Sequence, residues 1–274
     1  MVLNYHIEEM EGKKFPANSF KKNILKPIFD VQKEYYFHPF MAISKAHVIM
    51  LIEQNIIQKD EGKKILNALL EIENMDFKSL EYDDNFEDMF FMIENMLENM
   101  VGKDIAGRMH IARSRNDIDL CEFRIVLREM LVEVLKAIND YREVLIELIN
   151  DNLNTIMPAY THTQPAQPST LAHYLLAIYD ALRRDFKRVL MAMENLNKSP
   201  LGAAAITTTG FKISRERTSE LLGFDGLVEN SYDSIAGVDY LTQTASSLMI
   251  LNTNISKLLK DTLDFCTKEF NVYY

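Results

Sequence analysis

The feature that most limits how this chain can fold is a long, uninterrupted helical pattern between Asp117 and Asn154. The stretch contains no glycine or proline, and its apolar residues recur every three or four positions, as on one face of a helix. About 38 residues at 1.5 Å each give a helix of about 57 Å, several times the ~12-residue average length. Such a helix cannot bury its apolar face within a small globule. The sequence therefore predicts equally long partner helices, as in a bundle or coiled coil.

Two further stretches, Thr170–Asn197 and Ser234–Phe270, have the same spacing and are the expected partners. Shorter helical patterns precede them, at residues 41–54, 61–73 and 87–100. Gly102–Arg108 contains two glycines, interrupts the pattern and is the predicted domain boundary. We therefore expect an all-α chain, with a small N-terminal helical domain at residues 1–108 and an incomplete long-helix bundle at residues 109–274.

The composition excludes several other classes of protein. The chain has only 9 glycines and 7 prolines, too few for a sandwich or barrel that turns every 8–12 residues or so. A net charge of -10 disfavours binding to nucleic acid or to an anionic membrane surface. No stretch approaches the ~18 apolar residues of a membrane span. Cys121 and Cys266 lack metal-ligand spacing and are predicted to be buried thiols of a reducing compartment, so we expect a soluble, cytoplasmic protein.

The first candidate for chemistry is the segment Arg113-Ser114-Arg115-Asn116-Asp117, at the predicted start of the longest helix. Free N–H groups at a helix N-terminus favour negative charge, and an arginine can bind a carboxylate through two hydrogen bonds. The segment can therefore bind an anion. On the local pattern alone, an ordinary N-cap at Asn116 or Asp117 with solvated arginines is the commoner explanation.

The second candidate is Thr161-His162-Thr163-Gln164, in a predicted loop between two long helices. A histidine can exchange a proton near neutral pH or, as a cation, bind a carboxylate. A structural histidine that bonds to the loop backbone explains the pattern equally well. Prolines at positions 158, 165 and 168 fix the backbone of the loop, which favours a functional role.

Other features give weaker signals. The segment 202–205, rich in glycine and alanine, allows close backbone approach to a ligand. The acidic group at positions 83, 84, 87 and 88 lacks the spacing of a calcium loop and is interpreted as a solvated helix start. His47, His110 and His173 are expected to have structural roles. The sequence shows no zinc signature and no defensible Ser–His–Asp order.

In combination and order, these segments resemble the argininosuccinate lyase branch of the fumarase/aspartase superfamily, over nearly the whole chain. The motifs that carry the resemblance are His110 with Arg113-Ser114-Arg115-Asn116-Asp117, the loop with Tyr160-Thr161-His162, Gln164 and Gln167-Pro168, Pro200-Leu201-Gly202, Asn230-Ser231 with Asp233, and, more weakly, Ser44-Lys45-Ala46-His47 and Glu87-Asp88. The Arg-Ser-Arg-Asn-Asp string is specific to this branch.

The resemblance implies a reaction and a set of roles. Enzymes of this family remove a proton next to a carboxylate of a succinyl group, stabilise the resulting aci-carboxylate and break a C–N bond to release fumarate. The residues implied to bind substrate are Ser44, Ser114, Arg115, Asn116, Thr161 and Gln164. His162, with Thr161, is the implied acid/base group. No metal or organic cofactor is implied. The implied assembly is a homotetramer whose active sites combine residues from different subunits.

The sequence also departs from the branch. Ile111-Ala112 stands where the branch usually has Thr-Gly, Pro165 replaces an arginine, Phe90 replaces a histidine, and Ala236-Gly237-Val238-Asp239 replaces Ser-Asp-Arg-Asp. The motifs implied to bind the dicarboxylate are retained, whereas flanking polar groups are lost. The fumarate half of the substrate is therefore more firmly indicated than the amine half.

The family's third signature loop, Gly-Ser-Ser-x-Met-Pro-x-Lys-x-Asn-Pro, is expected soon after Phe270, but the printed chain ends at Tyr274. From this we expect the printed chain to be an N-terminal portion with little lyase activity alone and an exposed apolar face that favours association. Two alternatives stay open: a sister lyase that acts on another N-substituted aspartate, and a catalytically silent helical assembly protein.

Overall fold

The computed structural model describes residues 16–270. Contacts divide the chain into two compact units, one containing the chain to Val126 with Lys198–Ala236, and the other containing Leu127–Asn197 with the chain from Gly237 onward. The division falls within the longest helix, α8. The boundary predicted at residue 108 stays a prediction.

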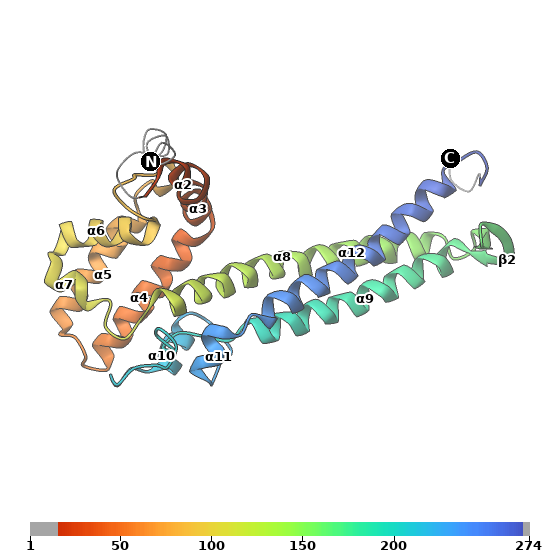
Figure 1. The fold of residues 1–274 in the computed structure, drawn as a ribbon. Helices are drawn as coiled ribbons and strands as arrows, with labels where there is room; N and C mark the ends of the chain where they lie inside the picture. The colour runs from red at the N-terminus through yellow and green to blue at the C-terminus, as the bar shows by residue number, and fades with distance from the viewer. Residues whose placement is uncertain (1–15, 271–274) are drawn as a thin grey trace, which may run out of the picture. The chain divides into compact units, whose positions relative to one another are not determined.

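The first unit is built from short and medium helices (Figure 1). Its elements are α2 (Asn18–Phe20), η1 (Lys21–Leu25), α3 (Lys26–Val31), η2 (Gln32–Tyr36), α4 (Phe37–Glu53), α5 (Lys59–Glu73), η3 (Phe77–Ser79), α6 (Met89–Val101), α7 (Lys103–Arg108), the start of α8 (Arg115–Asp151), α10 (Arg215–Leu221) and α11 (Ser231–Ala236). Here η1 and η2 are π-helical turns and η3 is a 3₁₀ turn.

The core of this unit is apolar and contains a stacked aromatic pair. The rings of Phe37 and Phe77 lie 4.0 Å apart and nearly parallel. Ile65, Leu69 and Ile93, from the two predicted stripes at 61–73 and 87–100, are fully buried. The spacing of apolar residues therefore identified the buried faces of these helices correctly.

The second unit is a bundle of three long helices, which Figure 1 shows running side by side. It contains α8 from Leu127, β1 (Ile156–Thr161), β2 (Gln164–Thr170), α9 (Leu171–Leu196) and α12 (Asp239–Phe265). Buried residues from each helix, such as Leu131, Leu182 and Leu251, form one core. The predicted all-α class and the long partner helices are confirmed. Among the described residues, no helix is both long and apolar enough to cross a membrane.

Several local predictions need correction. The stretch 157–168 is not a loop but an antiparallel hairpin. The pattern predicted as one helix at Ser234–Phe270 is two helices, because the chain leaves helical geometry at Gly237–Val238. The break at 102–108 is confined to Gly102, whose φ of 85° ends α6, and α7 follows at once. Cys121 is buried as predicted, but Cys266 is exposed.

Candidate functional site

The Arg113–Asp117 segment begins α8, and the fully buried carboxylate of Asp117 organises it. Its Oδ1 accepts a hydrogen bond from the Ser114 backbone N–H at 2.8 Å, as the third residue of a helix does in a capping box. Its Oδ2 accepts from the backbone N–H groups of Gly202 at 3.0 Å and Ala204 at 2.9 Å. Burial raises the pKa of Asp117 to about 6, against the opposing effect of these N–H donors and of Arg113. The N-cap of α8 is therefore Ser114 and not Asn116 or Asp117 as predicted, and Asp117 links the helix start to a distant loop.

Arg113 is buried, which corrects the prediction of a solvated side chain. One guanidinium nitrogen donates to Ser44 Oγ at 3.2 Å, and Nε donates to His110 Nδ1 at 3.4 Å. Because arginine can only donate, His110 Nδ1 is the acceptor, and its Nε2–H therefore donates to Glu94. Burial lowers the pKa of Arg113 to about 10, so the side chain remains charged at neutral pH. No carboxylate forms an ion pair with it in the part of the chain that the structure describes.

Ser44, a predicted substrate-binding residue, has no exposed surface. It lies on α4 as a partner of Arg113. In this structure its hydroxyl accepts a hydrogen bond from Arg113 and so helps to hold the Arg113–Asp117 segment in place. Its contact with substrate stays a prediction.

Arg115 is held in place within the first unit by carboxylates and by aromatic rings. One terminal nitrogen lies 2.5 Å from Asp88 and 3.9 Å from Asp119. The guanidinium also lies 5.4 Å from the Phe90 ring centre and 5.8 Å from that of Phe91. Phe90, where the family has histidine, thus contributes its ring face to the arginine. Asp88 is buried and caps α6, so its prediction as part of a solvated acidic group was wrong.

A carboxyl that sequence reasoning missed lies near this arginine. Glu122 is only 5% exposed, and burial, followed by the charge of Asp119, raises its pKa well above its ordinary value. The raised pKa favours the protonated carboxyl, which offsets less of the positive charge of Arg115 than a carboxylate would. Its position one turn beyond Asp119 on α8 was visible in the sequence, but its burial was not.

Ser114 and Asn116 present polar groups at the same helix start. The Ser114 Oγ accepts from the Asn116 backbone N–H at 3.3 Å, which leaves the hydroxyl hydrogen able to donate. The exposed Asn116 side chain donates one amide hydrogen to the Ala205 carbonyl at 2.8 Å. Its other amide hydrogen and its Oδ1 have no hydrogen-bond partner among the described residues. The segment therefore offers an arginine, a hydroxyl and an amide at a helix N-terminus, which suits a carboxylate.

The backbone before this segment has a strained residue. Ala112 adopts φ of 64°, a region that favours glycine and costs other residues about 1 kcal/mol or more. This is the position where the branch usually has glycine. The glycine-type conformation is thus retained although the glycine is not.

His47 has the structural role expected for it. Its Nε2–H donates to the Ile111 carbonyl at 2.9 Å, and the ring is 4% exposed. Burial, followed by the charge of Arg113, lowers the pKa of His47 from 6.5 to about 3. The folded protein therefore prefers the neutral ring, which carries the proton on Nε2.

We expect this histidine to make the protein sensitive to acid. Because its pKa is lower in the folded state than in the unfolded state, its contribution to stability is complete above pH 6.5. That contribution falls by up to about 1.4 kcal/mol per pH unit as the pH drops from 6.5 toward 3. Between pH 6.5 and 5, wild type should lose about 2 kcal/mol of unfolding free energy relative to His47→Gln. Urea denaturation at the two pH values measures this. His38→Gln, at an exposed position of the same helix, is the matched control, and an equal loss in wild type and His47→Gln would contradict the assignment.

The second candidate segment lies at the tip of the β1–β2 hairpin. Thr161 pairs with Gln164, so His162 and Thr163 form a two-residue turn. Their φ angles of 50° and 62° identify a type I′ turn. All four side chains are exposed. Thr161, His162 and Gln164 are therefore brought together at one tip, as predicted, by strand pairing rather than by a proline-fixed loop.

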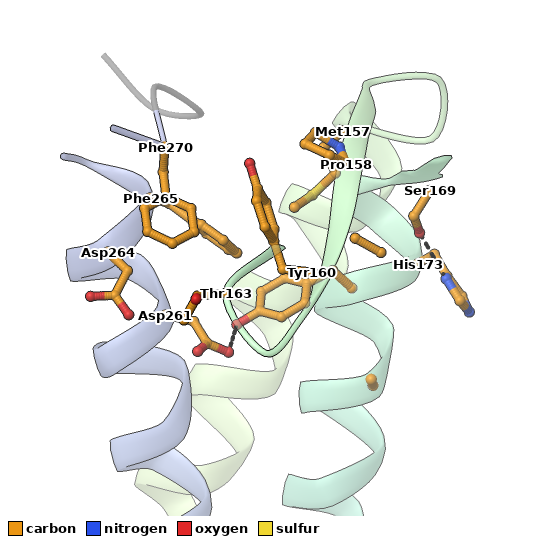
Figure 2. A pocket seen from close by; sticks show the side chains of 13 residues that line it. Met157, Pro158, Tyr160, Thr163, Ser169, His173, Asp261, Asp264, Phe265 and Phe270 are labelled. Atoms are coloured by element: carbon orange, nitrogen blue, oxygen red, sulfur yellow. Dashed lines mark hydrogen bonds between the residues drawn. The ribbon is translucent and has the colours of Figure 1, made fainter. Parts of the chain in front are cut away.

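A cavity of about 410 Å³ lies between this hairpin, the start of α9 and the end of α12 (Figure 2). Tyr160, Phe265 and Phe270 point into it, and the Tyr174 hydroxyl donates to Asp261 at 2.8 Å. Thr163 lines the cavity, whereas Thr161, His162 and Gln164 do not. Within residues 16–270, no group of three or more histidine, cysteine or acidic side chains is arranged to hold a metal ion.

Comparison with known proteins places this chain among lyases. Residues 19–273 match the model of a family described as lyase. Argininosuccinate lyase of Methanocaldococcus jannaschii is 43% identical over 93% of this chain, which spans 53% of that protein. Argininosuccinate lyase 2 of Agrobacterium fabrum is 40% identical over 92% of the chain and 50% of that protein. The chain thus spans about half the length of the curated relatives it matches.

Solved structures give the same fold. An EDDS lyase in complex with formate superposes with a TM-score of 0.82 and 33% identity over 97% of this chain and 53% of that one. A fumarate lyase:delta crystallin from Brucella melitensis has a TM-score of 0.71 at 17% identity, over 87% of this chain and 56% of that one, and supports the fold alone. The chain therefore belongs to the lyase family that matches residues 19–273, and its predicted similarity to the argininosuccinate lyase branch of the fumarase/aspartase superfamily is confirmed.

Proposed function

We propose that this chain forms part of a carbon–nitrogen lyase that cleaves argininosuccinate to arginine and fumarate by β-elimination. The observation that carries the proposal is the 43% identity to an argininosuccinate lyase over 93% of the chain. The arrangement at the start of α8 supports it, since Ser114, Arg115 and Asn116 offer donors to a carboxylate from one rigid helix end.

The chemistry assigns two tasks to the two segments. In the elimination, a base removes the proton next to a carboxylate, negative charge builds on that carboxylate, and the C–N bond breaks as the amine receives a proton. Donors at the start of α8 stabilise the charge because they are fixed before the reaction begins. His162 transfers a proton itself or orients the group that does. Thr161 and Gln164 bind substrate beside it.

We further propose that the complete protein is a homotetramer in which neighbouring subunits supply the two segments to one site. Exposed apolar side chains on the bundle support association. Met249 on α12 is 63% exposed, Leu259 is 56% exposed, and Met191 on α9 is 59% exposed. Light scattering on the protein produced from the complete reading frame tests this, and a monomer at assay concentration would contradict it.

Turnover of argininosuccinate by this complete protein, followed through the absorbance of fumarate, tests the activity. We expect fumarate and arginine in equal amounts. The similarity to EDDS lyase, together with Ile111 and Pro165, favours one alternative, a lyase for a different aminodicarboxylate. Turnover of another N-substituted aspartate with argininosuccinate inert would establish that alternative. A folded oligomer that turns over neither compound would remove both.

A further inference from the structure

Asp117 joins two stretches of chain that are far apart in the sequence. One carboxylate oxygen binds the Ser114 N–H, and the other binds the N–H groups of Gly202 and Ala204, 85 and 87 positions away. The residue has no exposed surface. Because a carboxylate has two acceptor oxygens, it can hold both sides at once, whereas an amide has only one.

The loop around residues 202–208 is shaped to make this contact. Gly202 has φ of 86°, and Ala204 and Thr208 have φ of 53° and 63°, in the region that non-glycine residues rarely adopt. The Thr208 hydroxyl donates to the Gly202 carbonyl at 2.8 Å, and Arg215 Nε donates to the Leu201 carbonyl at 2.9 Å. These bonds hold the two N–H groups of the loop toward Asp117.

The same loop also touches a residue of the candidate site. The Ala205 carbonyl accepts from the Asn116 amide, which directs the rest of that amide away from the loop. The loop position therefore determines the orientation of Asn116, and Asp117 determines where the loop lies relative to the start of α8.

We propose that Asp117 is a positioning residue: by binding the 202–204 backbone and the Ser114 N–H together, it sets the orientation in which Ser114 and Asn116 meet a substrate carboxylate. This rests on the proposed function for the identity of the substrate. It goes beyond that function by making the 202–205 loop part of the carboxylate-binding geometry. Asp117 itself does not touch the reacting atoms.

The test is Asp117→Asn in the complete protein. The variant keeps the size of the side chain but can satisfy only one side of the contact, since its NH₂ group faces an N–H on the other side. We expect the dissociation constant for fumarate and the KM for substrate to rise about tenfold, with a smaller change in kcat. Hydrogen exchange should become faster in both segments, 112–118 and 200–206.

Asp185→Asn is the matched control, because Asp185 is also fully buried and hydrogen-bonded, to Arg188 and Asn254 in the bundle. It should lower stability without changing fumarate binding. Gly202→Ala should disturb the same contact by shifting the loop, since an added Cβ would lie 2.5 Å from Arg215 Cγ. It should weaken fumarate binding in the same way, and the effects of the two variants should not add, because both break one contact.

The possible results distinguish a failure of this inference from a failure of the proposed function. If Asp117→Asn leaves fumarate binding and KM unchanged and only reduces the fraction of active protein, Asp117 has a structural role and the inference is wrong. If wild type binds no fumarate, the proposed function fails. In that case the exchange measurement still decides whether the contact exists: unchanged exchange in 200–206 overturns it, and faster exchange in both segments supports it.

Discussion

Replacing Arg115 by lysine in the complete protein is expected to lower kcat/KM for argininosuccinate by about 100- to 1000-fold. A guanidinium can bind a carboxylate through two charge-assisted hydrogen bonds, whereas an ammonium acts as a point charge, and each such bond contributes about 1.5–3 kcal/mol. The planar arginine also fits against the rings of Phe90 and Phe91, which a lysine cannot do as well. Steady-state kinetics with argininosuccinate measures the loss.

The control for this change is Arg217→Lys. Arg217 also bridges carboxylates, those of the exposed Glu53 and Glu220, but at a partly exposed position outside the candidate site. Exposed ion pairs contribute little to stability, so kinetics should stay close to wild type. If Arg115→Lys retains more than half of the wild-type kcat/KM while Arg217→Lys is unaffected, Arg115 does not bind the substrate.

His162→Asn is expected to reduce kcat by about 10²- to 10⁴-fold, the range typical of a lost acid–base group. Asparagine tolerates the left-handed backbone conformation that position 162 adopts, with φ of 50°, so the type I′ turn should persist. The substitution therefore removes the imidazole with little effect on the hairpin. Measurement of kcat and of its pH dependence tests this role.

Thr163→Asn, at the other position of the same turn, separates a change in the turn from the loss of the ring. Position 163 also has a positive φ, and asparagine suits it better than a β-branched residue. The variant should retain most of the wild-type kcat. Equal losses from both substitutions would indicate that the turn, and not the imidazole, is what activity requires.

The parts of the fold that the sequence predicted are those governed by local periodicity. The helices at 115–151 and 171–196 were predicted within about three residues of their ends, because an apolar stripe without glycine or proline leaves few alternatives. The helical turns at 18–36 were missed, since they are short and in part π-helical. The hairpin at 156–170 was missed because its exposed strands and three prolines give no alternating pattern.

The sequence predicted which residues form the candidate site, but not the tertiary contacts that hold them in place. The donors at 114–116 were visible as a motif, and Asp117 was visible as a possible cap. Its bonds to Gly202 and Ala204 were not, because they depend on a tertiary contact. The same holds for the burial of Arg113 and for the pairing of Arg115 with Asp88. A charged residue at a helix start gives no sign, in sequence, of whether it faces water.

We expect the Ser114–Asn116 segment to bind a carboxylate of the substrate. The most direct measurement is the position of fumarate in crystals of the complete protein. We expect one fumarate carboxylate within hydrogen-bond distance of the Ser114 and Asn116 side chains, with His162 of a neighbouring subunit beside the same molecule. Fumarate bound elsewhere, with Ser114 and Asn116 contacting only protein or water, would contradict the claim.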